Sequence, residues 1–303
     1  MRSRKHAVAL CTAICLIVSG LLFSPASPLK AATEYALQFD GVDDRVTFGP
    51  ATGPAGLGAS SFTLELWFMR TGAGVVTSTG TGGISAVPLL TKGRAEFDGD
   101  VRDMNYFLGI DAKARVLAAD FEDMATGLNH PVYGQTAIAD NIWYHAAATY
   151  DGATWRLYLN GDLDAELAVA GAALVRTPRS DSTQHAGLGT AMTSAGAREG
   201  AFKGQMDEVR IWNVARSQAE IQTAMSGPMT VLPAGLIGRW GLDDGTGTVA
   251  LNSVLGRPNG SLLPLNVPPL PPAPWRLNQV STVNEEVPST GVVRGNGPRS
   301  QTM

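Results

Sequence analysis

Apolar and polar residues alternate along much of this chain. In residues 62–68 every second side chain is Phe or Leu, which is the pattern of a β-strand with one strongly apolar face. Residues 143–150 and 154–159 are two more strand-like segments. Asn160-Gly161 then leads into a further alternating segment, and Asn-Gly between two such segments is a strong signal for a tight β-hairpin. The sequence therefore predicts a body built from antiparallel strands.

Further strands are expected at residues 35–39, 45–48, 87–91, 106–110, 116–121, 202–212 and 236–242. One helix is predicted after Ser217, which has the capping-box spacing to Glu220. Ile221 and Met225 supply its short apolar face, and the Gly-Pro pair at 227–228 ends it. The 35 glycines and 18 prolines fit strands joined by turns. About ten strands with one short helix indicate an antiparallel sandwich.

The two ends of the chain differ from its body. Residues 1–32 begin with basic side chains, continue with an apolar stretch and end in a Ser/Pro/Ala segment, which predicts a signal peptide cleaved near residue 26 or at 31–32. The alternative is a membrane anchor, because the apolar stretch lies just below the usual spanning length. Residues 264–303 predict a Pro-rich spacer followed by a disordered tail. One folded domain is thus expected over residues 33–263, with no stable membrane anchor in the mature chain.

Cys11 and Cys15 are the two cysteines of the chain, and both lie in the expected signal peptide. The mature protein is therefore expected to contain no disulfide, thiolate nucleophile or cysteine-bound metal. Residues 1–32 also hold four of the 23 basic residues and no acidic residue, so the remainder carries 19 basic against 27 acidic groups. This balance excludes a basic nucleic-acid-binding protein and favours cations such as calcium.

Several longer motifs occur in order along the body of the chain. They are ALQFDGVDDRV at 36–46, FTLELWF at 62–68, LTKG at 90–93, WYHAAATYDG at 143–152, WRLYLNG at 155–161, FKGQMDEVRIWNVARSQAEI at 202–221 and GLIGRWGLDDGTG at 235–247. Together they resemble the laminin G-like jelly-roll domain, part of the concanavalin A-like lectin/glucanase superfamily. The resemblance implies an all-β fold, an antiparallel jelly-roll sandwich of two curved sheets. It also implies a concave face or loop rim that often binds sugars, and frequently a calcium ion. Because such folds host lectins, glycosidases, lyases and adhesion modules, the resemblance does not define the function.

The best candidate for a cation site is an oxygen-rich turn. Asp40, Asp43 and Asp44 crowd a glycine, and calcium takes roughly six to eight hard oxygen ligands. In similar jelly rolls the first and last strands share such an ion, which implies Asp40, the Gly41 carbonyl and Asp207 as ligands beside Asp43. The ion would be structural, in place of the absent disulfides. The alternative is a plain Asp-Gly turn, with Asp207 capping its strand or pairing with an arginine.

Three acidic runs are candidates for the paired carboxyl groups that glycoside hydrolysis needs. Residues 96–100 contain a glycine and lack the third acid that related glucanases place on one strand, which favours a loop. Asp162, Asp164 and Glu166 alternate and are interpreted as a solvated outer face of a strand. Residues 120–123 are interpreted as a solvated loop edge for the same reason. No arrangement of residues specifies catalysis.

A glycan site is expected between residues 95 and 135, the stretch that least resembles the family. Sugar-binding sites combine aromatic rings with polar side chains, and this stretch contains Asn105, Tyr106, Asn129, His130 and Tyr133. The leading interpretation is a secreted, non-enzymatic binding module for a polysaccharide or cell-surface glycan, with structural calcium. The alternatives are a protein-adhesion or surface-display module with a surface-protein partner, or a polysaccharide hydrolase or lyase.

Overall fold

The computed structural model describes residues 35–169, 175–226, 229, 231–264 and 275–277. The expected signal peptide, the Gly-Pro pair after the helix and nearly all of the expected spacer and tail lie outside these described residues. Within them, no helix combines the length and the apolar character that crossing a membrane requires.

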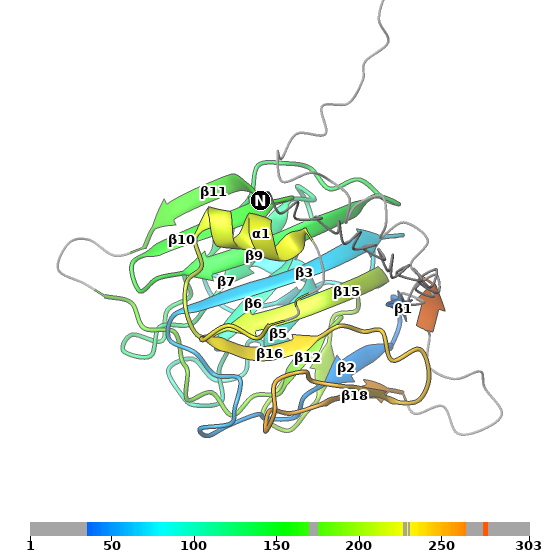
Figure 1. The fold of residues 1–303 in the computed structure, drawn as a ribbon. Coiled ribbons are helices and arrows are strands. Elements are labelled where there is room, and N and C mark those ends of the chain that lie inside the picture. Colours follow the sequence, from blue (N-terminus) through cyan, green and yellow to red (C-terminus); the bar gives the residue numbers. More distant parts are fainter. Residues whose placement is uncertain (1–34, 170–174, 227–228, 230, 265–274, 278–303) are drawn as a thin grey trace, which may run out of the picture. The chain divides into compact units, whose positions relative to one another are not determined.

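The described chain forms two large antiparallel sheets that face each other (Figure 1). The first sheet has eight strands in the order β11-β10-β9-β3-β15-β1-β19, with β16 paired to β15. Its strands are β1 (Tyr35–Asp40), β3 (Phe62–Arg70), β9 (Trp143–Tyr150), β10 (Thr154–Leu159), β11 (Asp162–Ala168), β15 (Lys203–Trp212), β16 (Leu236–Trp240) and β19 (Trp275–Leu277). The long central strands are the ones that the alternating pattern predicts.

The second sheet has nine strands in the order β17-β18-β2-β12-β5-β6-β7-β8, with β4 paired to β5. Its strands are β2 (Arg45–Thr47), β4 (Thr77–Ser78), β5 (Ser85–Lys92), β6 (Tyr106–Asp111), β7 (Leu117–Asp120), β8 (Val132–Tyr133), β12 (Ala186–Leu188), β17 (Val249–Ala250) and β18 (Gly260–Leu263). Two short strands, β13 (Ala191–Met192) and β14 (Arg198–Glu199), form a separate ribbon. The predicted all-β antiparallel sandwich is confirmed.

The core lies between the two sheets. Alternate side chains of β3 project into this core and are fully buried there. They are Phe62, Leu64, Leu66 and Phe68. Phe62 also meets the ring of Tyr106 from the second sheet, with ring centroids 5.4 Å apart. The apolar face predicted for residues 62–68 is therefore the face that joins the sheets.

Segments far apart in the sequence pair directly. Strand β1 lies antiparallel to β15, with Leu37 opposite Met206 and Asp40 opposite Lys203. Strand β18 in turn pairs with β2 in the second sheet, placing Ser261 opposite Thr47. The opening and closing parts of the domain are thus neighbours, as the resemblance implies.

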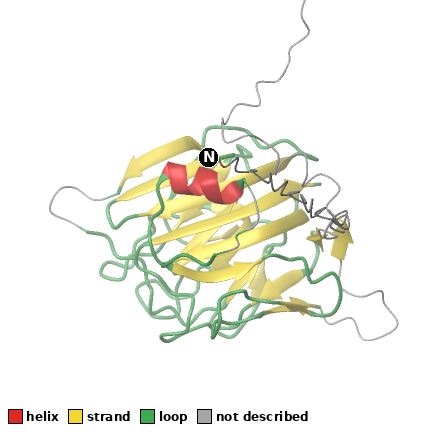
Figure 2. Ribbon diagram, viewed as in Figure 1, coloured by secondary structure: helices red, strands yellow, loops and turns green. Residues whose placement is uncertain are grey.

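The hairpin turn and the helix that the sequence predicts are both present in the structure. Asn160 and Gly161 have φ angles of 53° and 78°, the positive values that a type I′ hairpin turn requires at both positions. Helix α1 (Gln218–Met225) begins after Ser217 with the predicted capping box. Its buried residues Ile221 and Met225 pack on the first sheet, which lies behind the helix in Figure 2.

Candidate functional site

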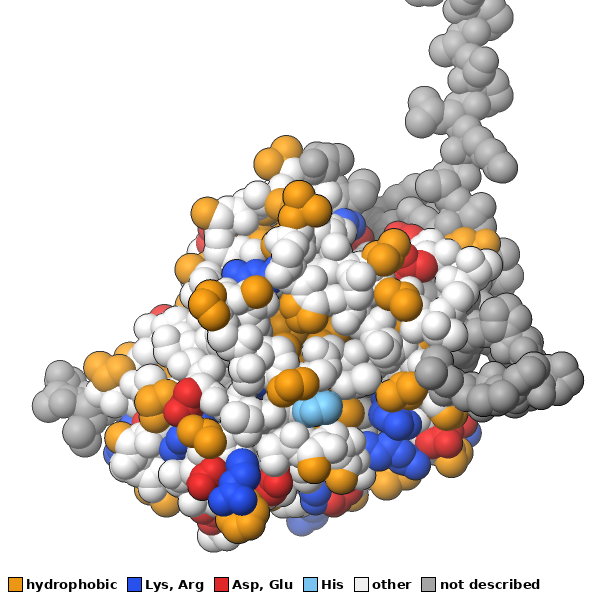
Figure 3. Space-filling view, turned by 90° about the horizontal axis from the view of Figure 1, so that it is seen from below, with side chains coloured by type: hydrophobic (Ala, Val, Ile, Leu, Met, Phe, Trp, Pro, Cys, Tyr) orange, Lys and Arg blue, Asp and Glu red, His pale blue; other side chains and the backbone are white. Residues whose placement is uncertain are grey.

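A hollow of about 480 Å³ opens on the outer side of the second sheet. Val46 and Leu262 face the core from β2 and β18, so their neighbours in the same strands face away from it. The hollow is lined by Arg45, Thr47, Phe48, Gly49, His185, Met192, Ala195, Gly196, Asn259, Ser261 and Leu263. Figure 3 shows the side of the molecule on which β2 and β18 lie, with charged side chains gathered along one edge.

The lining combines apolar surface with hydrogen-bonding side chains. Thr47 and Ser261 are cross-strand neighbours and bring two hydroxyl groups to the same wall. Burial, together with the charge of Lys92, lowers the pKa of His185 below its ordinary value. The imidazole is therefore neutral near pH 7, with one nitrogen that donates and one that accepts. Such a set of groups can bind a ligand rich in hydroxyls.

Two features position His185 in the wall. The Lys92 ammonium donates to the carbonyl oxygens of Gln184 and Pro50, at 2.8 and 2.6 Å. It thereby links the segment that contains His185 to the segment that follows β2. A Cβ at Gly196 would lie 3.0 Å from Cε1 of His185, and Gly196 has a φ of +77°. A glycine is therefore the residue that leaves room for the imidazole in this turn.

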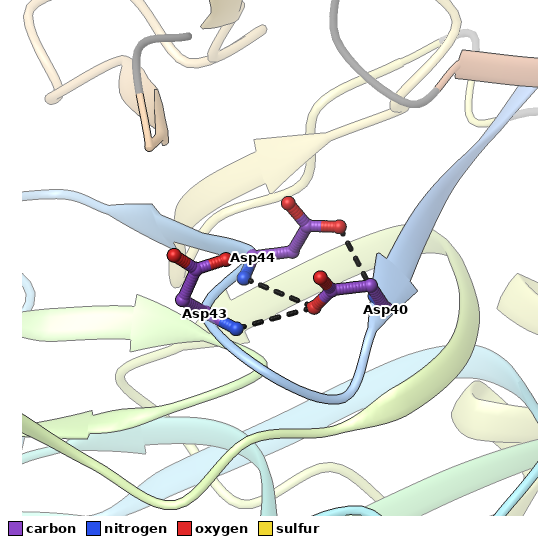
Figure 4. Close-up of side chains that lie close together, drawn as sticks. All are labelled: Asp40, Asp43 and Asp44. Carbon is purple, nitrogen blue, oxygen red and sulfur yellow. Dashed lines mark hydrogen bonds between the residues drawn. The ribbon is translucent and has the colours of Figure 1, made fainter.

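The predicted acidic turn joins β1 to β2 and leads directly to Arg45 in the hollow. One carboxylate oxygen each of Asp40, Asp43 and Asp44 lies within 4.8 Å of the others (Figure 4). Asp40 Oδ1 accepts hydrogen bonds from the backbone amides of Val42, Asp43 and Asp44, and the Asp40 amide donates to Asp44 Oδ2. Burial and the charges of Asp40 and Asp43 raise the pKa of Asp44 to about 6. Hydrogen bonds between the turn's own backbone amides and its carboxylates therefore stabilise it.

Basic side chains also surround this turn. Arg45 donates to the Asp43 carbonyl oxygen at 2.9 Å, and Arg198 donates to the Val42 carbonyl oxygen at 3.1 Å. A Cβ at Gly41 would lie 2.7 Å from the Cβ of Lys203, which crosses over the glycine. The carbonyl oxygens of Val42 and Asp43 are therefore bonded to guanidinium groups.

Asp207 does not belong to this turn, so the expectation that it shares an ion with Asp40 is corrected. The β1–β15 register places Lys203 opposite Asp40, and Asp207 lies four residues further along β15. At about 3.3 Å per residue this is a separation of roughly 13 Å. The Asp207 side chain is buried, and its Oδ1 accepts from the Glu208 amide. Sequence alone does not supply this register.

The five residues expected to bind a glycan divide into two groups. Asn105 and Tyr106 are fully buried, which removes them from a surface site. The Asn105 amide bonds the backbone of Ala59 in both directions at 2.9 Å, and the Tyr106 hydroxyl donates to Leu57 at 3.0 Å. Both side chains therefore fix the loop before β3 rather than face a ligand.

The other three lie at the opposite edge of the second sheet from the hollow, on and before β8. Tyr133 is 44% exposed, whereas Asn129 and His130 are half-buried. The Asn129 amide donates to the Thr81 carbonyl oxygen, and the His130 ring lies 5.0 Å from that of Phe121. The structure does not bring these residues to the hollow.

Sequence reasoning missed the hollow and misplaced one acidic run. The hollow draws on residues 45–49, 185–196 and 259–263, which are adjacent only through strand pairing. Asp120, Glu122 and Asp123 form no solvated edge, because each is at most 1% exposed. Segment 177–179 covers Glu122 and Asp123, with the Thr177 amide bonded to Asp123 Oδ1 and Arg179 beside Glu122. The spacing of acidic residues along the chain does not reveal that a distant segment buries them.

A family model described as the concanavalin A-like lectin/glucanases superfamily matches residues 40–222. The chain therefore belongs to this superfamily. It is 28% identical over 184 residues to human (Homo sapiens) pappalysin-1, covering 57% of this chain but only 10% of that relative's length. A solved structure of a candidate carbohydrate-binding protein from Bacteroides ovatus is 22% identical, with a TM-score of 0.52, over 80% of this chain and 62% of that one. At this identity the likeness shows a shared fold.

Proposed function

We propose that this chain is a secreted, non-enzymatic module that binds a glycan in the hollow beside β2 and β18. The observation that carries the proposal is the hollow itself, with Thr47, Ser261 and His185 around it. Its volume of about 480 Å³ lies within the range of ligand-binding pockets. The carbohydrate-binding role named for the Bacteroides ovatus protein is consistent with this proposal.

The chemistry of the lining suits a sugar ring. Each sugar hydroxyl both donates and accepts, as do the hydroxyls of Thr47 and Ser261 and the neutral imidazole of His185. Met192 and Leu263 add apolar surface for the C–H face of a ring. None of the residues lining the hollow is acidic, and glycoside hydrolysis ordinarily uses two carboxyl groups. Binding without cleavage is therefore the function that this lining favours.

The proposal is tested with a glycan array, followed by calorimetry on the glycan that binds best. His185→Ala and Thr47→Val should each weaken binding about tenfold, the effect of losing a hydrogen bond worth roughly 1.4 kcal/mol. Tyr133→Ala is the matched control, because Tyr133 lies on β8 at the far edge of the sheet. Loss of binding in Tyr133→Ala alone would place the glycan where the sequence predicted it. Absence of any glycan binding, with capture of a surface protein instead, would favour the adhesion alternative.

Calcium at the acidic turn and secretion both remain predictions. The ligands proposed for the ion are Asp40, the Gly41 carbonyl and Asp43, and Asp43→Asn should then reduce calcium binding. Secretion predicts that exported protein begins after Ala26, Ala31 or Ala32, which N-terminal sequencing of culture medium checks. Retention of an uncleaved chain in the membrane would favour the anchor alternative.

A further inference from the structure

The lining of the hollow offers more hydrogen-bond donors than acceptors. Asn259 Oδ1 accepts from the Asn252 backbone amide at 2.9 Å, which leaves the NH₂ group as the part of the Asn259 side chain that is open to a ligand. Thr47 Oγ1 accepts from the Gly49 amide at 3.1 Å, which uses one lone pair and leaves the O–H group to donate. In both side chains the protein's own backbone therefore occupies an acceptor and leaves a donor free.

Arg45 adds the strongest donor group of the lining. It is half-buried on β2, two residues before Thr47 and on the same face of that strand. Its Nη1 donates to the Asp43 carbonyl oxygen, which uses one of the five N–H groups of the guanidinium. Within the described part of the chain, Nε and Nη2 of Arg45 have no hydrogen-bond partner. The two N–H groups along this edge match the two oxygens of a carboxylate.

The charges around Arg45 also favour an anionic ligand. Burial, and after it the charge of Arg198, lowers the pKa of Arg45 below its ordinary value, whereas the charge of Asp43 acts in the opposite direction. The guanidinium remains protonated at neutral pH, as guanidinium groups in proteins do. None of the described residues that line the hollow is acidic. An anion bound beside Arg45 would therefore offset the repulsion between the two guanidinium groups.

We propose that the ligand of the hollow is an acidic glycan, whose sugar carboxylate binds Arg45 while its hydroxyls bind Thr47 and Asn259. This inference rests on the function proposed above and names the class of glycan. Since strand residues rise about 3.3 Å each, Arg45 and Thr47 lie roughly 7 Å apart along β2, and one sugar unit can contact both. A carboxylate accepts hydrogen bonds without donating any, so it suits a lining with surplus donors better than a further hydroxyl does.

The test compares glycans that differ at one carbon. One member of each pair ends in a hexuronic acid, and the other ends in the corresponding hexose, which has a hydroxymethyl group in place of the carboxylate. Calorimetry on the full chain at neutral pH and low salt should show roughly tenfold or tighter binding of the hexuronate, the effect expected of charge-assisted hydrogen bonds. Salt at about 1 M should reduce this preference, because Arg45 is only half-buried.

Arg45→Gln should abolish the preference. Its affinity for the hexuronate should fall roughly tenfold or more, whereas its affinity for the hexose should change less than about threefold. Arg45→Lys should retain part of the preference, because it keeps the charge but not the two-pronged edge. Arg198→Gln is the matched control, because Arg198 also donates to a carbonyl oxygen of the acidic turn, that of Val42, but does not line the hollow. Thermal unfolding checks that each variant is folded.

The outcomes separate this inference from the function on which it rests. Equal binding of hexuronate and hexose by the native chain would overturn the acidic ligand and leave glycan binding in the hollow intact. An unchanged preference in Arg45→Gln, an equal loss in Arg198→Gln, or stronger binding of a sulfated glycan that has no carboxylate would also overturn it. Binding of no glycan at all would overturn both proposals. Sialylated glycans carry their carboxylate on a different carbon, so their affinity relative to the hexuronates identifies which acidic sugar binds.

Discussion

Removal of the Phe62 ring is expected to destabilise the fold strongly, because this ring joins the two sheets. It is fully buried, and its centroid lies 5.4 Å from that of Tyr106 in the second sheet and 5.4 Å from that of Trp155 in the first. A second neighbour from the first sheet, Tyr150, lies 6.2 Å away. Phe62→Ala would leave a cavity ringed by large aromatic side chains that cannot readily collapse into it.

The expected loss is about 3–5 kcal/mol of unfolding free energy, which is a large part of the stability of an ordinary domain. It corresponds to a fall in melting temperature of about 6–20 °C for a domain of this size. Urea unfolding followed by tryptophan fluorescence measures the change. Phe97→Ala is the matched control, because Phe97 is 50% exposed and its ring lies against the Arg102 guanidinium, whose Cζ is 3.9 Å from the ring centroid.

The control should lose less than about 1 kcal/mol, because it removes an exposed ring and one cation–π contact. Equal losses in the two variants, or a Phe62→Ala loss below about 1 kcal/mol, would mean that Phe62 does not lie in a close-packed interface between the sheets.

Three further local features are tested by urea unfolding. Ser217→Ala should cost about 1 kcal/mol by removing the helix N-cap, and an unchanged midpoint would contradict that role. Gly189→Ala should cost more than about 1 kcal/mol, because Gly189 has a φ of +72° and a Cβ there would lie 2.6 Å from the Phe39 ring. Gly82→Ala is the control and should cost less, because a Cβ at Gly82 would meet no atom within 4 Å. Burial and nearby arginines lower the pKa of His145 to about 3, so the unfolded chain binds more protons and stability falls as the pH drops from 6.5 toward 3. His145→Gln should make this fall shallower, and an identical slope would contradict it.

Much of the fold was predictable because its signals are local. The alternation in residues 62–68 determines a buried face, and Asn160-Gly161 determines a turn, without reference to distant residues. The short strands β12, β13 and β17 were not predicted. Each has two or three residues, too few for a period, and each exists because a neighbouring strand supplies its hydrogen bonds.

The candidate sites were less predictable because they depend on register and burial. The acidic turn was found, since Asp40, Asp43 and Asp44 are close in sequence. Asp207 was misplaced, because a shift of two residues between paired strands keeps the same side chains facing the core, so the alternating pattern does not fix the register. The burial of Asn105 depends on the loop that covers it, which no nearby residue reveals.

The most direct test of glycan binding in the hollow is a chemical-shift titration. Amide resonances of the ¹⁵N-labelled chain are recorded as the best-binding glycan from the array is added. A glycan bound in the hollow should cause the largest shifts at Thr47, His185 and Ser261, on the three segments that meet there. Largest shifts at Tyr133 and its neighbours on β8, with Thr47 and His185 unmoved, would contradict it.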